Sequence, residues 1–243
     1  MNKSRTWRII ALVTIVTAAG LLLMACGGGD DDPDTTVTVS PEPNPSLDAG
    51  ATQQLRDLAG KWGETVTKIT YALNSASGSL TNASQVVLYQ EGPDRRIDNI
   101  GVNGTATVIV RTSLGYTCLD TTSTCALLTT EEANSAAEFV PFVSDLADNA
   151  GLKAIIAGAT ELESAPARNV IGRETSCLKA AGNLGGIQGE ATWCFTEDGL
   201  LLAINYSGGA QTFDMTATTI EGTKATDFEP PYTVATLPPT ATP

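Results

Sequence analysis

Five cysteines stand out as the residues whose type and spacing could support chemistry, because this 243-residue chain has no histidine. Zinc binding is disfavoured, since zinc sites draw on histidines or on closely spaced CxxC pairs, and the chain has neither. Cys118, Cys125, Cys177 and Cys194 allow three disulfide pairings. Their close spacing favours Cys118–Cys125 across a short turn and Cys177–Cys194 across a longer loop. We therefore predict two local disulfides in an exported chain.

The fifth cysteine, Cys26, follows a segment ordered like an export signal. Lys3, Arg5 and Arg8 precede an apolar stretch at 9–23, which is short for a membrane span and fits a signal peptide better. Its ending, "LMAC", resembles the lipobox of bacterial lipoproteins. In those proteins the cysteine receives a diacylglycerol, the chain is cut before it, and the new N-terminus is acylated, as with palmitate. Met24 departs from this pattern, and an ordinary signal peptide or an uncleaved anchor helix is the alternative.

Catalytic, metal and cofactor sites are hard to assemble from the remaining residues. Without histidine, the usual general base near neutral pH is missing, and the serines lack an SxxK signature. Glutamate pairs at 131–132 and 161–163 fit solvated faces or a helix cap. The glycine-rich stretch at 182–189 has no GK[ST] ending, and "DDDPD" at 30–34 lacks the spacing of a calcium loop. We expect no enzyme activity, no cofactor and no metal.

The charge balance narrows the choice of partners. The net charge is −13, and removal of residues 1–25 takes away three basic residues and no acidic ones. A chain this acidic is not expected to bind nucleic acid or anionic lipid headgroups through its surface. Contact with a membrane must then come from a lipid anchor at Cys26 or from apolar surface.

Composition divides the chain into four parts. Residues 1–25 are the predicted signal peptide. Residues 26–50 contain mostly Gly, Asp, Thr, Ser and Pro and are predicted to be a disordered tether. Residues 51–232 are long enough for one domain with a single core. Residues 233–243 form a Thr/Pro-rich tail that we expect to stay extended.

The domain begins with a helical pattern and continues with strands. An amphipathic helix is predicted from the apolar residues Leu55, Leu58, Ala59 and Trp62. Segments of period two follow, separated by turn residues, and return after about residue 165. Between them lies a helical insertion, with a capping-box spacing at Thr129 and Glu132 and a break at Pro141. Short links favour one antiparallel sheet, so the predicted class is α+β.

Several predicted strands are apolar on both faces. In "GLLLAINY" at 199–206, no polar residue appears until Asn205. A strand with one face in water would alternate cleanly between apolar and polar residues. Two explanations stay open: a sheet covered by core on one face and helices on the other, or a curved sheet around an apolar cavity that the central helices plug.

The order of elements, closing on "GLLLAINY", "TFDMTAT" and "DFEPP", resembles the lipoprotein-carrier superfamily, whose members include LolA, LolB, LppX and LprG. The likeness covers nearly all of residues 51–230 and depends on this order, including Asp198–Gly199 and Asp227–Phe228, rather than on a sharp motif. It implies an unclosed antiparallel half-barrel wrapped around the helical insertion, with acyl chains in its cavity. The two cysteine pairs are not a general feature of that superfamily.

The sequence and this resemblance together predict a membrane-anchored envelope lipoprotein that binds or shuttles a lipid or glycolipid. We expect the cavity to be lined by Val86, Leu88, Val108, Val110, Leu202, Ile204 and Phe213, with Phe139, Phe142 and Leu146 as its lid. A register error of one residue would invert these faces. The alternative is an envelope sensor or structural interaction module with the same fold, a filled core and an unidentified protein partner.

Overall fold

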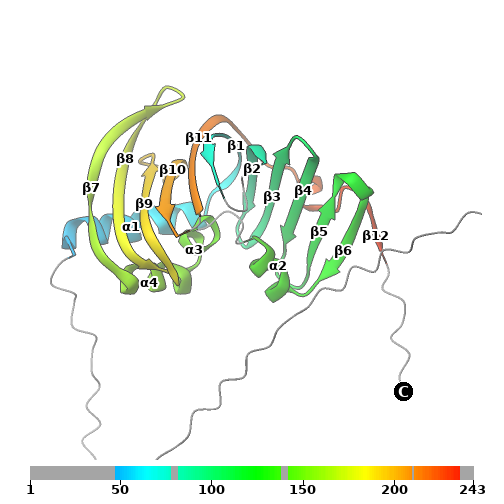
Figure 1. The fold of residues 1–243 in the computed structure, drawn as a ribbon, viewed down its shortest axis with the longest axis horizontal. Helices are drawn as coiled ribbons and strands as arrows, with labels where there is room; N and C mark the ends of the chain where they lie inside the picture. Colours follow the sequence, from blue (N-terminus) through cyan, green and yellow to red (C-terminus); the bar gives the residue numbers. More distant parts are fainter. Residues whose placement is uncertain (1–46, 78–81, 138–141, 210, 236–243) are drawn as a thin grey trace, which may run out of the picture. The chain divides into compact units, whose positions relative to one another are not determined.

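The computed structural model describes residues 47–77, 82–137, 142–209 and 211–235 (Figure 1). Cys26 and the predicted signal peptide lie outside the described residues, as do Phe139 and the last residues of the tail. Across the described ranges, no helix has the length and apolar character needed to cross a membrane.

One unclosed, mostly antiparallel sheet dominates the structure. Its twelve strands are ordered β12-β6-β5-β4-β3-β2-β1-β11-β10-β9-β8-β7, so β12 and β7 form the edges. Only β12 runs parallel to its neighbour among the paired strands described. In chain order the strands are β1 Val66–Ala76, β2 Ala83–Glu91, β3 Asp94–Gly101, β4 Gly104–Val110, β5 Gly115–Leu119, β6 Thr124–Leu128, β7 Ala159–Val170, β8 Arg173–Leu184, β9 Ile187–Phe195, β10 Leu201–Gly208, β11 Gln211–Glu221 and β12 Thr233–Ala235. The structure is therefore α+β, with a strand placed in the tail predicted to be extended.

The helices fall at the start of the domain and between β6 and β7. They are α1 Ala49–Gly63, α2 Thr130–Ala137, α3 Val143–Ala147 and α4 Asn149–Gly158, with short 3-10 turns η2 Asp120–Thr122 and η3 Ala225–Phe228. Helix α1 begins where the Asp48 carboxylate accepts the N–H of Ala51 (3.0 Å), and it buries Leu55, Leu58, Ala59 and Trp62.

The predicted capping box is confirmed at the start of α2. The Thr129 N–H donates to Glu132 Oε2 (2.8 Å), and the Glu132 N–H donates to Thr129 Oγ1 (3.2 Å). Helix α2 then lies against β5 at Gly115, where a Cβ atom would collide with Ala133. Glycine at this position therefore lets the helix approach the sheet closely. The "LKAIIAGATELE" stretch, ambiguous in the sequence, is divided between α4 and β7.

Two disulfides cross neighbouring antiparallel strands. Cys118 of β5 is bonded to Cys125 of β6, and Cys177 of β8 is bonded to Cys194 of β9. In each case the two cysteines are direct partners in the strand register. All four are buried. The structure thus has the two local pairings that the sequence favours.

Candidate functional site

Six of the seven strand residues expected to line a cavity share one face of the sheet, and the seventh, Leu202, lies at a register shift in β10. Leu88 of β2 lies opposite Ile97 of β3, which in turn lies opposite Val108 of β4. Across the other half, Ile204 of β10 lies opposite Met215, two positions from Phe213 in β11. Because side chains alternate between faces along a strand, these registers place the predicted set on a common side except for Leu202, where the shift between Leu201 and Ala203 interrupts the alternation. The set comprises Val86, Leu88, Val108, Val110, Leu202, Ile204 and Phe213, each exposed by 5% or less.

Phe142 covers the part of this face formed by β9, β10 and β11. Its ring meets Trp193 at 5.7 Å between centroids and 78° between planes, and it meets Tyr206 at 5.2 Å and 60°. Tyr206 in turn packs on Phe213 at 5.5 Å. Edge-to-face contacts of this kind add stability beyond area burial, about 0.5–1.5 kcal/mol for each pair. Phe142 therefore packs on the aromatic side chains of β9 and β10 on this face.

The backbone at Phe142 is unusual. Its φ of 72° lies in the left-handed region, which non-glycine residues adopt rarely and at a cost of about 1–3 kcal/mol. The strained residue starts α3, and the same helix buries Leu146 beside it. The surrounding contacts must hold this conformation, because local preference opposes it.

The face is covered by protein in this structure. A side chain that lined an open hollow would itself be accessible, and the nine described residues of the predicted set are almost fully inaccessible. They belong to one hydrophobic core with Trp62 and Trp193. Leu146 also borders a cavity of about 300 Å³ between α1 and α4, where Arg56 and Lys153 stand at the solvent side.

Polar groups occupy one end of the same face. Gln90 of β2 and Arg95 of β3 are direct cross-strand partners. Gln90 Nε2 donates to the Trp62 carbonyl, and Arg95 Nη1 donates to the Ser144 carbonyl of α3 (3.0 Å). Trp62 Nε1 donates to the Val143 carbonyl (3.3 Å), so α1 and α3 are tied together above this end of the sheet.

Burial controls the electrostatics of this polar end. It lowers the pKa of the Arg95 guanidinium, while Asp148 and Asp145 act in the opposite direction. Burial also raises the pKa of the Asp145 carboxyl, and the Arg95 charge counteracts that rise. The sequence reading missed Gln90 and Arg95, although the period-two pattern through Leu88 already places Gln90 on the apolar face.

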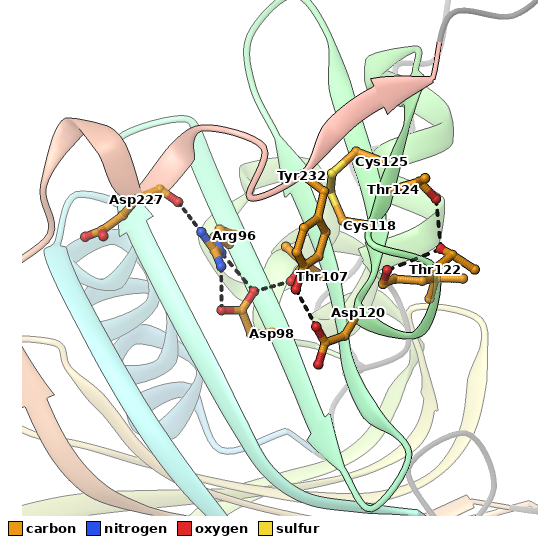
Figure 2. The surroundings of a disulfide bond; sticks show 11 residues. Arg96, Asp98, Thr107, Cys118, Asp120, Thr122, Thr124, Cys125, Asp227 and Tyr232 are labelled. Atoms are coloured by element: carbon orange, nitrogen blue, oxygen red, sulfur yellow. Dashed lines mark hydrogen bonds and ion pairs between the residues drawn. A yellow bond between two sulfur atoms is a disulfide. The ribbon is translucent and has the colours of Figure 1, made fainter.

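A second polar network lies around the Cys118–Cys125 disulfide (Figure 2). Arg96 makes a two-pronged ion pair with Asp98, at 2.8 Å from Nε to Oδ1 and 3.0 Å from Nη2 to Oδ2. Thr107 donates to the same carboxylate (2.7 Å), and Arg96 Nη1 donates to the Asp227 carbonyl (2.9 Å). These contacts fix η3 on the sheet next to the segment that ends in β12.

Groups suited to metal binding do not gather within the described ranges: no cluster of three or more His, Cys, Asp or Glu residues occurs there. The glutamates weighed as a catalytic pair, Glu161 and Glu163, are exposed on edge strand β7. Glu132 is engaged in the helix cap described above.

No protein-family model and no curated protein matches the chain. It is similar to the solved structure of LprF from Mycobacterium bovis, at 12% identity and a TM-score of 0.46 over 76% of this chain and 98% of the other. It is also similar to the lipoprotein LppX of Mycobacterium tuberculosis, at 12% identity and a TM-score of 0.47 over 70% of this chain and 95% of the other. A third similar structure is a chain of the Pseudomonas aeruginosa MucA/MucB complex, at 12% identity and a TM-score of 0.41 over 74% of this chain and 61% of the other. Identities this low leave the ligand and the function to be decided from this chain's own residues.

Proposed function

We propose that this protein is a lipid-anchored lipoprotein of the bacterial cell envelope that binds or shuttles a lipid or other amphiphile on the apolar face of its unclosed sheet. The face runs from β4 through β3, β2, β1 and β11 to β10, and its apolar side chains belong to one hydrophobic core. Burial of an acyl chain on such a surface is favourable by about 25 cal/mol per Å² of apolar area.

The observation that carries this proposal is the way Phe142 occupies the face. Its ring sits between Trp193 and Tyr206 in a backbone conformation that phenylalanine disfavours. Phe142 stands directly before the short helix α3. Because its backbone is strained, displacing its ring by another apolar group costs less free energy than displacing a core residue with a relaxed backbone. An acyl chain entering this region would take over the contacts of the ring and release the strain.

A second candidate function has its own support. Every described residue of the predicted lining is exposed by 5% or less, as expected for a filled core. Under this alternative, the same fold is an envelope sensor or interaction module that binds a protein partner and holds no lipid.

Lipid analysis separates the two functions. The exported protein, carrying Cys26→Ser so that it can be purified without its own lipid, is extracted and the extract is examined by mass spectrometry. Co-purifying amphiphile in near-stoichiometric amount, together with displacement of a fluorescent fatty acid, supports the carrier. A protein that emerges empty and binds no fluorescent fatty acid overturns the carrier in favour of the interaction module.

Membrane anchoring through Cys26 has a separate test. Cys26→Ser should move the protein from the membrane fraction to the soluble fraction, because the predicted acylation would be lost. The double variant Cys118→Ser/Cys125→Ser is the matched control, since it replaces two other cysteines, with loss of their disulfide, and should leave the protein in the membrane fraction. Unchanged membrane association of Cys26→Ser would contradict the anchor.

A further inference from the structure

Three buried side-chain atoms without a hydrogen-bond partner lie at the polar end of the apolar face. They are Gln90 Oε1, Arg95 Nε and Ser144 Oγ, out of five such atoms in the described part of the chain. Gln90 is 0% exposed and faces Arg95 across the strand register, and Arg95 already contacts Ser144 through its carbonyl. Buried polar groups in native proteins are nearly always paired, so a cluster of unpaired ones needs an explanation.

The cluster continues a stripe of apolar residues. Leu88 precedes Gln90 by two positions on the same face of β2, and Val110 lies opposite Arg95. Helix α3 covers both parts at once: Leu146 and the adjacent Phe142 cover apolar residues, while the Ser144 carbonyl accepts from Arg95. The segment that covers this face is therefore apolar along its length and presents one oxygen acceptor at the end where Gln90 and Arg95 lie.

The N–H donors of Arg95 at that end match the two oxygens of an anion better than the single oxygen of a carbonyl. The Nε–H and the Nη2–H of a guanidinium point the same way and form a fork that matches two oxygens of a carboxylate or phosphate. Helix α3 supplies one oxygen to Nη1, outside this fork, and none to Nε. Asp145 and Asp148 offset part of the Arg95 charge. Both belong to the covering segment, so its withdrawal leaves Arg95 and Gln90 on the sheet with the positive charge less compensated.

We propose that Arg95, with Gln90 beside it, binds the head of an anionic amphiphile, a fatty carboxylate or a monoalkyl phosphate, whose chain lies on the apolar face in place of Phe142 and Leu146. This inference rests on the proposed function and assigns its substrate class. The Arg95 fork binds the anionic oxygens, and the free Gln90 carbonyl accepts a hydrogen bond from a hydroxyl of the head where one is present.

The test compares two ligands with the same chain and different heads. Affinities for dodecyl phosphate and dodecanol are measured on the full chain by displacement of a fluorescent fatty acid. Dodecyl phosphate should bind about tenfold more tightly or better, as expected for hydrogen bonds to a charged group. Arg95→Met, which keeps an apolar stem, should abolish this preference, so that the variant binds dodecyl phosphate and dodecanol with affinities equal within about twofold.

Two further variants make the result interpretable. Arg95→Lys keeps the positive charge but lacks the two-donor fork, so it should retain only part of the preference for dodecyl phosphate. This variant keeps the test decisive if Arg95→Met fails to fold. Arg111→Met removes a half-exposed arginine that follows β4 and is paired with Asp94 of β3. This variant should retain the full preference for dodecyl phosphate.

The outcomes that overturn the inference differ from those that overturn the function. Equal affinities for dodecanol and dodecyl phosphate in the unmodified protein would refute the anionic head and leave the amphiphile carrier intact. Absence of binding by both would refute carrier and head together. Inorganic phosphate alone should not compete at micromolar concentration, and tight competition by it would reassign Arg95 to a free-anion site.

Discussion

Phe142 and Trp193 meet edge to face, with ring centroids 5.7 Å apart and planes inclined at 78°. Trp193 belongs to strand β9 of the sheet, and Phe142 belongs to an insertion whose backbone is strained at that residue. The contact therefore joins the part of the fold that offers an apolar surface to the part that covers it. Changes at Phe142 should alter the cover while leaving the surface intact.

Phe142→Ala is expected to lower the free energy of unfolding by about 3–5 kcal/mol, because a large buried ring is lost. The same change should increase the affinity for a fluorescent fatty acid, because the ring no longer competes for the face. Urea unfolding and a binding titration measure the two effects. Phe228→Ala is the matched control: Phe228 is 3% exposed and lies outside the core on this face, so its loss should destabilise without improving binding. Equal effects of both variants on binding would contradict the role of Phe142.

Arg96 is expected to hold the C-terminal segment against the sheet. Arg96→Met leaves the buried Asp98 carboxylate with Thr107 as its remaining side-chain partner and removes the bond to the Asp227 carbonyl. Breaking a buried ion pair from one side costs about 3–5 kcal/mol. Hydrogen exchange should accelerate in η3 and β12 more than in β8.

Lys68→Met is the control for Arg96, because the Lys68–Glu221 pair is partly exposed and should contribute less than about 1 kcal/mol. Uniform acceleration of exchange throughout the sheet in Arg96→Met would show a general loss of stability instead of a local attachment.

The sequence predicted those features that depend on local pattern. The alternation in "ATVIVRT" places Val108 and Val110 on one face, and the structure keeps them there because the pleat repeats every two residues. The spacing of Thr129 and Glu132 predicted a helix start for the same reason: a capping box is complete within four residues.

Features that depend on distant partners could not be predicted in this way. The left-handed φ of Phe142 is imposed by its packing on Trp193 and Tyr206, which lie more than fifty residues further along the chain. The pairing of β12 with β6 brings together a Thr/Pro-rich tail and a strand more than a hundred residues earlier, and neither segment carries a local signal for the other. The same holds for the contact of Arg95 with Ser144.

Glu132 should make the stability of the helical insertion depend on pH. The N–H and hydroxyl of Thr129 donate to its carboxylate and hold its pKa below the usual value. Since the folded-state pKa is the lower one, the stabilisation is fully present above the unfolded pKa of about 4.3. It is lost as the pH falls through the folded pKa.

Glu132→Gln should consequently be less stable than the unmodified protein at pH 7, and the difference should shrink between about pH 5 and pH 3. Urea unfolding at a series of pH values measures this. Glu131→Gln, one residue earlier in the same first turn, is the matched control. A difference for Glu132→Gln that stays constant down to pH 3 would show that its charge is not responsible.

Ile171 offers a stabilising substitution at the tip of the β7–β8 hairpin. Its φ is 47°, that of Gly172 is 78°, and the Gly172 N–H donates to Asn169 Oδ1 (3.1 Å). Two consecutive positive φ values define a tight hairpin turn in which Asn-Gly is the preferred pair, whereas a β-branched residue is strained there. The Ile171 side chain is 44% exposed, so its replacement gives up little packing.

Ile171→Asn is therefore expected to raise the free energy of unfolding by about 1 kcal/mol, seen as a higher midpoint in urea and a higher Tm. Val102→Asn is the matched control, because Val102 is 85% exposed in the β3–β4 turn and does not have a positive φ. That control removes exposed apolar surface without relieving strain and should change stability by less than about 0.5 kcal/mol. If both variants gained equally, the gain would come from the loss of apolar surface; if Ile171→Asn lost stability, the isoleucine would be making contacts at the hairpin tip that outweigh its strained backbone.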